Sequence, residues 1–299
     1  MFRRAIRLTL SVSVLLVGVA EAQVQRKIEL QKLTAADVRV LEASARRGEQ
    51  RSMTIVGIAL AEGRGVAMDA MGAVRWLEKA AKSDDVAQEY LGTMLRNGRG
   101  VVKNLARARV MFAKAASLGN RRAQYDYASL CFNGEGGPQD VDSAAKYFEI
   151  AARQGDPEAQ HMIGRMYQYG RGVVQDFDQA TRWYEAAAKQ NHVPSIFALG
   201  ISYVEGDMGV RDGERARKYL ERAASMGSWV AAVKIANMYH TGESAPRNDA
   251  EAYKWFAIAR ELSGADTSPS AASLESQLKP LELASAQEEI TQWKAMRAK

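Results

Sequence analysis

The chain has 299 residues, of which 47% are hydrophobic and 25% charged, and it carries a formal net charge of +6 and a single cysteine. This is the composition of a folded protein of one or two domains, and it excludes disorder throughout the chain. The lone Cys131 excludes an internal disulfide framework, so stability must come from packing.

The first 22 residues have the order of a secretory signal peptide. Three arginines near the start precede an apolar run from Leu8 to Ala20, and small residues around Glu21 follow. The run is about 13 residues long, whereas a membrane-spanning helix needs about 20. We therefore expect cleavage before Gln23, a periplasmic or secreted mature chain that does not span the membrane, and no nucleic-acid partner despite the pI of 9.3.

Residues 23–49 are expected to form an N-terminal segment with a capping helix. The sequence around Leu41 matches the sequence 36 residues later, which predicts a half-repeat helix from about Ala35 to Arg47. Thr34 precedes this helix and is expected to be its N-cap. The helix would cover the apolar face of the first repeat.

A repeat occupies residues 50–263. Small residues recur every 35 or 36 positions, and a glycine-bearing turn follows each of them. Nineteen residues after each small anchor lies an aromatic residue or a methionine, with an alanine four positions later. This spacing predicts six two-helix units, none of which can bury its apolar face alone. The anchors are Gly57, Gly92, Ala128, Gly164, Gly200 and Ala236.

The turn reads GRG in three of the repeats, as a phosphate-binding loop could. A phosphate-binding loop also needs a Lys and a Ser or Thr at the start of its helix, whereas Val173, Val174 and Gln175 follow Gly172. Because the turn recurs in graded form in every repeat, we interpret it as a fold element and expect no nucleotide or other cofactor.

Residues 264–299 are expected to form a linker and C-terminal capping helices. Pro280 is a suitable first residue for the last helix, because its fixed φ suits a helix N-terminus. Apolar residues then recur on one face of that helix, which predicts that it seals the last repeat. They are Leu283, Ala286, Ile290 and Trp293.

The repeat around Gly164 resembles the Sel-one-like repeat family. The resemblance rests on Ala159, Gln160, Gly164, Tyr167, Gly170, Gly172, Val173, Asp176, Ala180, Trp183 and the alanines at 186–188. It implies an all-α, right-handed α-solenoid of about six two-helix repeats with helical caps. It also implies a non-enzymatic scaffold for a protein or peptide partner, in envelope assembly, signalling or surface polysaccharide processes. The family offers no common catalytic residues to carry over.

Few residues suggest catalysis or metal binding. Ser143 and Lys146 fit the SxxK pattern of β-lactam hydrolases, and His240–Gly242 faintly resembles their KTG element. These segments lie in different repeats, so a hydrolase stays a minor alternative. His161, His192 and His240 are also spread over different repeats, and we expect no metal site.

A partner-binding face is predicted on the first helix of each repeat. The positions three before, one after and four after the anchor share one helix face, and in related repeats this face lines the concave groove. Phe197, Ile201 and Val204 are expected to expose an apolar patch there, unless a neighbouring turn or the C-terminal cap covers them. The predicted partner-binding residues are Tyr125, Phe132, Arg165, Tyr169, Phe197, Ile201, Val204 and His240.

A second interpretation assigns binding to the turns. Arg64, Arg99 and Arg171 recur in the GRG turns and would form a basic row along one edge. Together with the mildly basic charge, they leave open an anionic glycan or lipid headgroup as the ligand.

Overall fold

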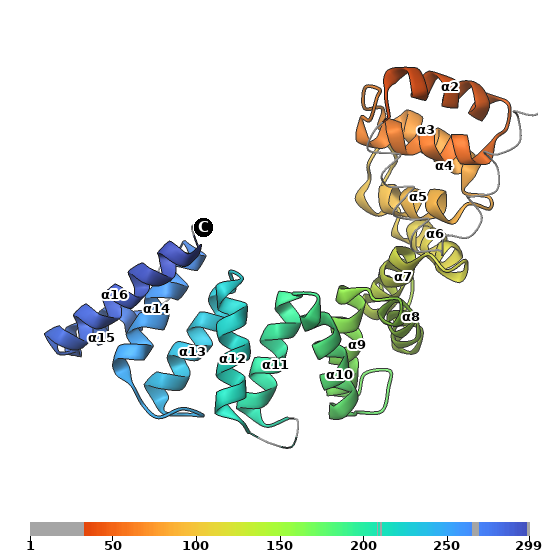
Figure 1. Ribbon diagram of the computed structural model, residues 1–299. Coiled ribbons are helices and arrows are strands. Elements are labelled where there is room, and N and C mark those ends of the chain that lie inside the picture. Colours follow the sequence, from red (N-terminus) through yellow and green to blue (C-terminus); the bar gives the residue numbers. More distant parts are fainter. Residues whose placement is uncertain (1–32, 208, 210, 265–268, 298–299) are drawn as a thin grey trace, which may run out of the picture. The chain divides into compact units, whose positions relative to one another are not determined.

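The computed structural model describes residues 33–207, 209, 211–264 and 269–297 (Figure 1). Within these ranges the regular secondary structure consists of helices alone, α2 to α16. The expected signal peptide, residues 1–22, lies outside the described residues. No helix in the described part of the chain combines the length and the apolar character needed to cross a membrane.

The helices fall into two compact units, Met1–Gln139 and Asp140–Lys299. The first unit contains α2 (Ala35–Arg46), α3 (Gln50–Glu62), α4 (Ala70–Ala80), α5 (Asp85–Asn97), α6 (Leu105–Ser117) and α7 (Arg121–Asn133). The second contains α8 (Val141–Arg153), α9 (Pro157–Tyr169), α10 (Phe177–Lys189), α11 (Val193–Glu205), α12 (Gly213–Ser225), α13 (Trp229–Thr241), α14 (Asp249–Ser263), α15 (Pro269–Gln277) and α16 (Pro280–Arg297).

Consecutive helices pack in pairs. The closest pairs are α3 with α4, α5 with α6, α9 with α10, α11 with α12, and α13 with α14, as the two-helix repeat requires. The first helix of each repeat has 13 residues. The predicted all-α solenoid of two-helix repeats is confirmed.

Each glycine anchor allows a large side chain of the second helix to reach the first helix. A Cβ atom added at Gly92 would lie 2.8 Å from the Phe112 ring, and one added at Gly164 would lie 2.9 Å from the Tyr184 ring. Both aromatic side chains are completely buried. They lie twenty residues after the anchor, one position beyond the residues that the spacing singled out. Those residues, Met111 and Trp183, are only half-buried.

The glycine turns have a structural role. Gly170 ends α9 in the left-handed conformation, with φ of 62°. Gly65 has φ of +66°, and a Cβ atom there would lie 2.8 Å from the carbonyl oxygen of Leu33, next to the start of α2. The turn therefore needs glycine both for its backbone conformation and for close packing on the neighbouring repeat.

Helices cap both ends of the described chain. Thr34 is the N-cap of α2, and its hydroxyl and backbone form a capping box with Asp37. At the other end Ala286 is buried, and Leu283, Ile290 and Trp293 pack against the core of the second unit. The stripe predicted on the last helix therefore faces that core.

Candidate partner-binding faces

In the first unit, a charged cluster lies between α5 and α7. It includes the positions three before and four after the α5 anchor, Glu89 and Arg96, which we call the inner part of the predicted face. Arg96 Nη1 lies 2.6 Å from Asp126 Oδ1, and Arg122 Nε lies 3.3 Å from Glu89 Oε1. Glu89 and Asp126 are 6% and 5% exposed, whereas the Arg122 side chain is 72% exposed. The carboxylates therefore join adjacent repeats, and the arginines are the parts that solvent can reach.

Burial controls the protonation of Glu89. Desolvation, with a smaller contribution from the nearby Asp126, raises the pKa of this carboxyl to about 7 against the opposing effect of Arg122. The Thr93 hydroxyl donates a hydrogen bond of 3.3 Å to Glu89 Oε1. Below neutral pH the neutral acid is the favoured form in the folded protein.

The predicted residues Tyr125 and Phe132 lie on α7 of the same unit. Both are half-buried. The carbonyl oxygen of Phe132 accepts a 2.7 Å hydrogen bond from the side chain of Gln139, which anchors the end of α7 to the turn that follows it. These two aromatics have partial access to solvent, less than an open patch would give.

In the second unit, the inner part of the face holds a cluster of two histidines and a serine. His161 Nδ1 lies 3.1 Å from Ser195 Oγ, and His192 Nδ1 lies 2.9 Å from the same oxygen. A hydroxyl has one proton, so Ser195 can donate to only one of the two rings and accepts from the other. The rings are 5.2 Å apart, and Tyr184 lies 5.5 Å from His161.

This cluster has the residue types of a nucleophile, a base and a carboxylate. Glu158 Oε1 lies 3.2 Å from His192 Nε2, although Nε2 lacks a hydrogen bond of good geometry. Ser195 Oγ is an unsuitable nucleophile, because the residue is completely buried and no substrate can reach it. The contacts join α9 to α11, so the cluster packs adjacent repeats together.

The same burial keeps His161 neutral. Desolvation, with smaller contributions from the neighbouring His192 and Arg165, lowers the pKa of its imidazole to about 4. The ring therefore contributes to stability as an uncharged group.

The outer part of this face is more accessible. Arg165 and Tyr169 are exposed on α9, the tyrosine by 61%. Phe197 and Ile201 on α11 are half-buried and pack against the core of the unit. They contribute apolar surface beside the two exposed residues.

Val204 is a correction to the predicted apolar patch. Its side chain is 1% exposed and belongs to the core of the second unit. The equivalent position on α9 holds Gln168, which is also buried and donates a 3.1 Å hydrogen bond to Asp207 beyond the end of α11. The position four after the anchor faces the adjacent repeat in both helices, which is why it is covered.

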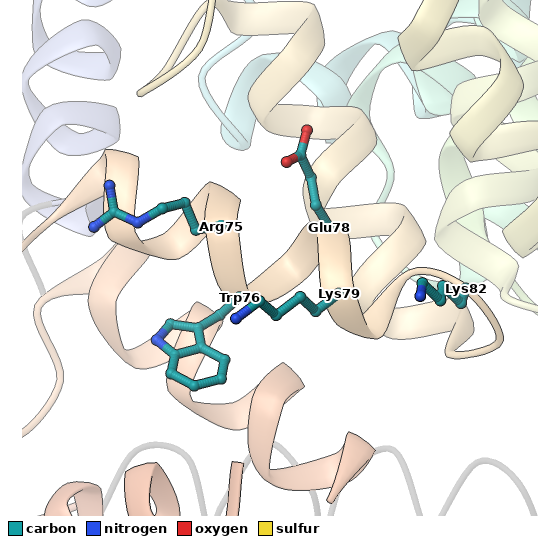
Figure 2. Close-up of a pocket in the computed structure, with 5 residues that line it drawn as sticks. All are labelled: Arg75, Trp76, Glu78, Lys79 and Lys82. Carbon is teal, nitrogen blue, oxygen red and sulfur yellow. The ribbon is translucent and has the colours of Figure 1, made fainter. Parts of the chain in front are cut away.

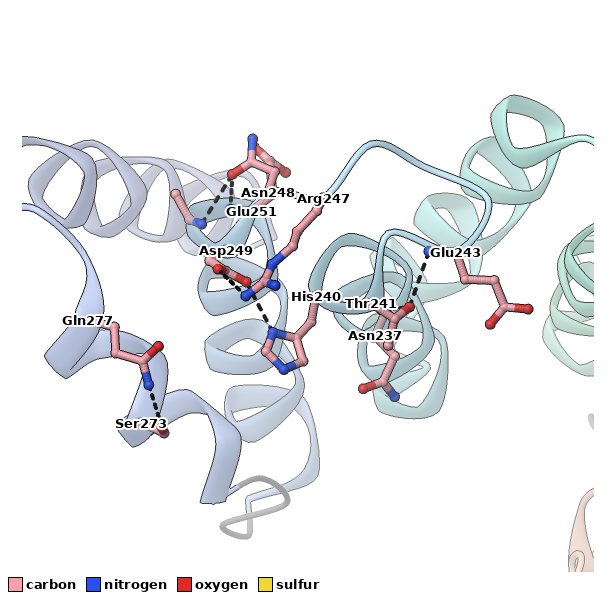
Figure 3. A network of polar contacts seen from close by, with 11 residues as sticks. Asn237, His240, Thr241, Glu243, Arg247, Asn248, Asp249, Glu251, Ser273 and Gln277 are labelled. Carbon is pink, nitrogen blue, oxygen red and sulfur yellow. Dashed lines mark hydrogen bonds and ion pairs between the residues drawn. The ribbon is translucent and has the colours of Figure 1, made fainter.

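His240 is held by the start of the next helix. Its Nδ1 lies 3.1 Å from Asp249 Oδ1, and Arg247 donates a 2.9 Å hydrogen bond to the other oxygen of that carboxylate (Figure 3). The bond from Arg247 holds the pKa of Asp249 below its usual range. With 41% of its side chain exposed, His240 is accessible at the end of α13.

The residues that resembled hydrolase motifs lie at ordinary positions of two different helices. The Ser143 backbone N–H donates to Asp140, the N-cap of α8, and Lys146 Nζ lies 5.8 Å from the centre of the Tyr147 ring. His240–Gly242 forms the end of α13, in another repeat. Among the described residues, His, Cys, Asp and Glu form no group that could hold a metal ion.

The turn arginines of the first unit are already engaged. Arg99 donates a hydrogen bond to the carbonyl oxygen of Ala61, in the preceding repeat, and Arg64 forms an ion pair with Glu62. Arg99 therefore joins two consecutive repeats, and Arg64 is paired within its own repeat. They are poorly placed to form a row of free cations.

A comparison with protein families gives the same repeat. The Sel1 repeat matches six times, at residues 50–85, 86–120, 121–156, 157–192, 193–228 and 229–263. The chain belongs to the Sel1 repeat family. Sel1 repeat proteins are generally non-enzymatic scaffolds for protein interactions.

Solved structures of similar fold come from several bacteria. A Sel1 repeat protein from Oxalobacter formigenes is 26% identical, with a TM-score of 0.67 over 92% of this chain and 87% of its own. A protective antigen of uropathogenic Escherichia coli with an SLR fold is 19% identical, with a TM-score of 0.48 over 87% of this chain and 79% of its own. An immunity protein from Pseudomonas aeruginosa is 20% identical, with a TM-score of 0.45 over 74% of this chain and 84% of its own. A comparison with curated proteins found no match.

Proposed function

We propose that this Sel1 repeat protein is a periplasmic or secreted adaptor that binds a protein or peptide segment along the first-helix faces of its repeats. In the second unit the binding residues are Arg165, Tyr169, Phe197, Ile201 and His240. In the first unit they are Tyr125 and Phe132. The role would be in envelope assembly, signalling or surface polysaccharide processes.

The pairing of Tyr169 with Arg165 carries this proposal. Tyr169 is a 61% exposed aromatic at the end of a rigid helix, and Arg165 is exposed one turn earlier. Tyrosine and arginine are enriched among residues that dominate binding energy at protein interfaces. Because α9 is fixed by its contacts with α8, α10 and α11, little ordering entropy opposes association at this surface.

Site-specific photo-crosslinking tests the face directly. A photoreactive phenylalanine analogue at Tyr169 should give a discrete crosslinked adduct in cells of the source organism, because a partner chain would lie against it. The matched control is the same analogue at Val174, which is 88% exposed on the turn after α9. Equal crosslinking at both positions, or none at Tyr169, would count against the face.

Export is tested separately. A fusion of residues 1–30 to alkaline phosphatase, which is active only outside the cytoplasm, should give active enzyme. Replacing the arginines near the N-terminus by glutamate should abolish this activity. A fusion that is inactive despite normal expression would refute the periplasmic or secreted location and leave the binding face untouched.

A further inference from the structure

A second accessible surface lies on α4, the second helix of the first repeat. Arg75, Lys79 and Lys82 line a shallow pocket of about 510 Å³ together with Trp76 and Glu78. Figure 2 shows Lys79 beside the Trp76 indole, with Arg75 and Lys82 at opposite ends of the pocket. The Lys79 ammonium lies 4.8 Å from the centre of the indole ring.

The positive charge of this pocket is poorly neutralised. Lys79 and Lys82 form no ion pair with any residue that the structure describes, and Arg75 approaches its nearest carboxylate only to 3.8 Å. The one carboxylate in the pocket, Glu78, is bound at 3.1 Å by Arg107 of the next second helix. The pocket therefore presents an excess of cationic groups around an aromatic ring.

This arrangement breaks the repeat pattern. Arg75, Lys79 and Lys82 lie 18, 22 and 25 residues after the anchor Gly57. Each of the other second helices, α6, α8, α10, α12 and α14, has an uncharged residue at one or two of these three positions. Those residues are Val110, Ser117, Ile150, Ala186, Ser225 and Ile258. Since packing makes similar demands on every repeat, a departure confined to α4 points to a task other than packing.

The charge of the surrounding unit has the same sign. Between residues 33 and 139, Lys and Arg outnumber Asp and Glu by 16 to 11, whereas between residues 140 and 299 they number 19 against 22. The positive character of the chain therefore resides in the first unit. Such a field raises the local concentration of an anionic ligand near the pocket.

We propose that the α4 pocket binds a polysaccharide that contains uronic acid residues. Carboxylates of the sugar would form ion pairs with the Lys79 and Lys82 ammonium groups, and sugar hydroxyls would donate hydrogen bonds to the Glu78 carboxylate. The apolar C–H face of a sugar ring would pack on the Trp76 indole. The carboxylate side chains of an acidic peptide and the phosphate of a lipid supply the negative charge, but they have no flat C–H face of a sugar ring to pack on the indole.

Calorimetric titration of the purified chain with sodium polygalacturonate tests the site. The double variant K79E/K82E should bind about tenfold more weakly, since it removes two attractive contacts and adds two repulsive ones. The matched control R182E/K189E makes the same change in net charge at exposed positions of α10 and should bind as the unaltered chain does. Dextran provides a neutral polymer that should not bind.

Three results would overturn the proposal. Polygalacturonate could fail to bind, or both double variants could lose affinity equally, which would indicate diffuse charge attraction. Poly-glutamate or phosphatidylglycerol vesicles could bind with the same affinity and the same sensitivity to K79E/K82E, which would assign the pocket to an acidic peptide or a membrane surface. Any of these results leaves the first-helix faces, which lie on other helices, unaffected.

Discussion

Acid should destabilise the second unit through His161. Between pH 7.5 and pH 5 the unfolded chain takes up a proton at this histidine, whose ordinary pKa is about 6.5. The folded chain resists protonation, because burial and the adjacent His192 and Arg165 lower the pKa of the ring to about 4. Stability from this group is therefore complete above pH 6.5 and falls as the pH drops toward 4.

The size of the effect follows from the two pKa values. A difference of 2.5 between about 6.5 and about 4 corresponds to a limit of about 3 kcal/mol at low pH. At pH 5 the unfolded histidine is almost fully protonated and the folded one mostly neutral, which gives a loss of about 2 kcal/mol. Ser195 and Tyr184 face the ring and carry no charge at these pH values, and the Glu158 carboxylate lies beside His192.

Hydrogen exchange read out by mass spectrometry can measure this loss locally. Peptides from α9 and α11 should lose about 2 kcal/mol of protection between pH 7.5 and pH 5, after correction for the intrinsic exchange rate. The variant His161→Gln keeps a hydrogen-bond donor for Ser195 and cannot be protonated. Its loss of protection between the two pH values should therefore be smaller than that of the unaltered chain by about 2 kcal/mol. His240→Gln removes a more exposed histidine of the same unit and serves as the matched control. Equal pH dependence in the unaltered chain and in His161→Gln would refute the reasoning.

Three further changes test the packing of the first unit. Glu89→Gln should raise the free energy of unfolding by about 3 kcal/mol at pH 8 and by about 1 kcal/mol at pH 5, because the raised pKa of about 7 makes Glu89 costly mainly when it is ionised. Urea titration at both pH values measures this difference. Arg96→Ala should lower the free energy of unfolding by about 3 kcal/mol, since it leaves the carboxylate of Asp126 buried without its partner. Adding Asp126→Asn should restore part of this stability. Gly92→Ala should lower the free energy of unfolding by about 1–3 kcal/mol in the same assay, because the new methyl group would overlap the buried Phe112 ring. An unchanged free energy of unfolding would show that the two helices can separate freely.

The repeat was predictable because its signals are local. A small anchor, a glycine turn and an aromatic at fixed spacing recur in one stretch of sequence, and each acts within a single hairpin. The capping helices were predictable for the same reason, from Thr34 as an N-cap and from an apolar stripe on the last helix. What the spacing missed was the residue one position later, such as Tyr184, because helix rotation within the hairpin decides which of two adjacent residues faces the anchor.

The candidate face was less predictable because it depends on contacts between repeats. Arg96 meets Asp126 and His161 meets Ser195, and no local pattern specifies which side chains of adjacent first helices come together. Val204 illustrates the error, since a position that would be accessible on an isolated hairpin is covered once the next repeat is stacked on it.

Glu89 and His161 occupy the same place in their repeats, three residues before the anchor. Burial raises the pKa of the acid and lowers that of the base, so in both cases the neutral form is favoured between adjacent first helices. The inner part of the face is therefore committed to stacking the repeats, and changes there alter stability before they alter binding. In the proposed binding mode, specificity for a partner would therefore come from exposed residues such as Arg165 and Tyr169, which can change without loss of packing.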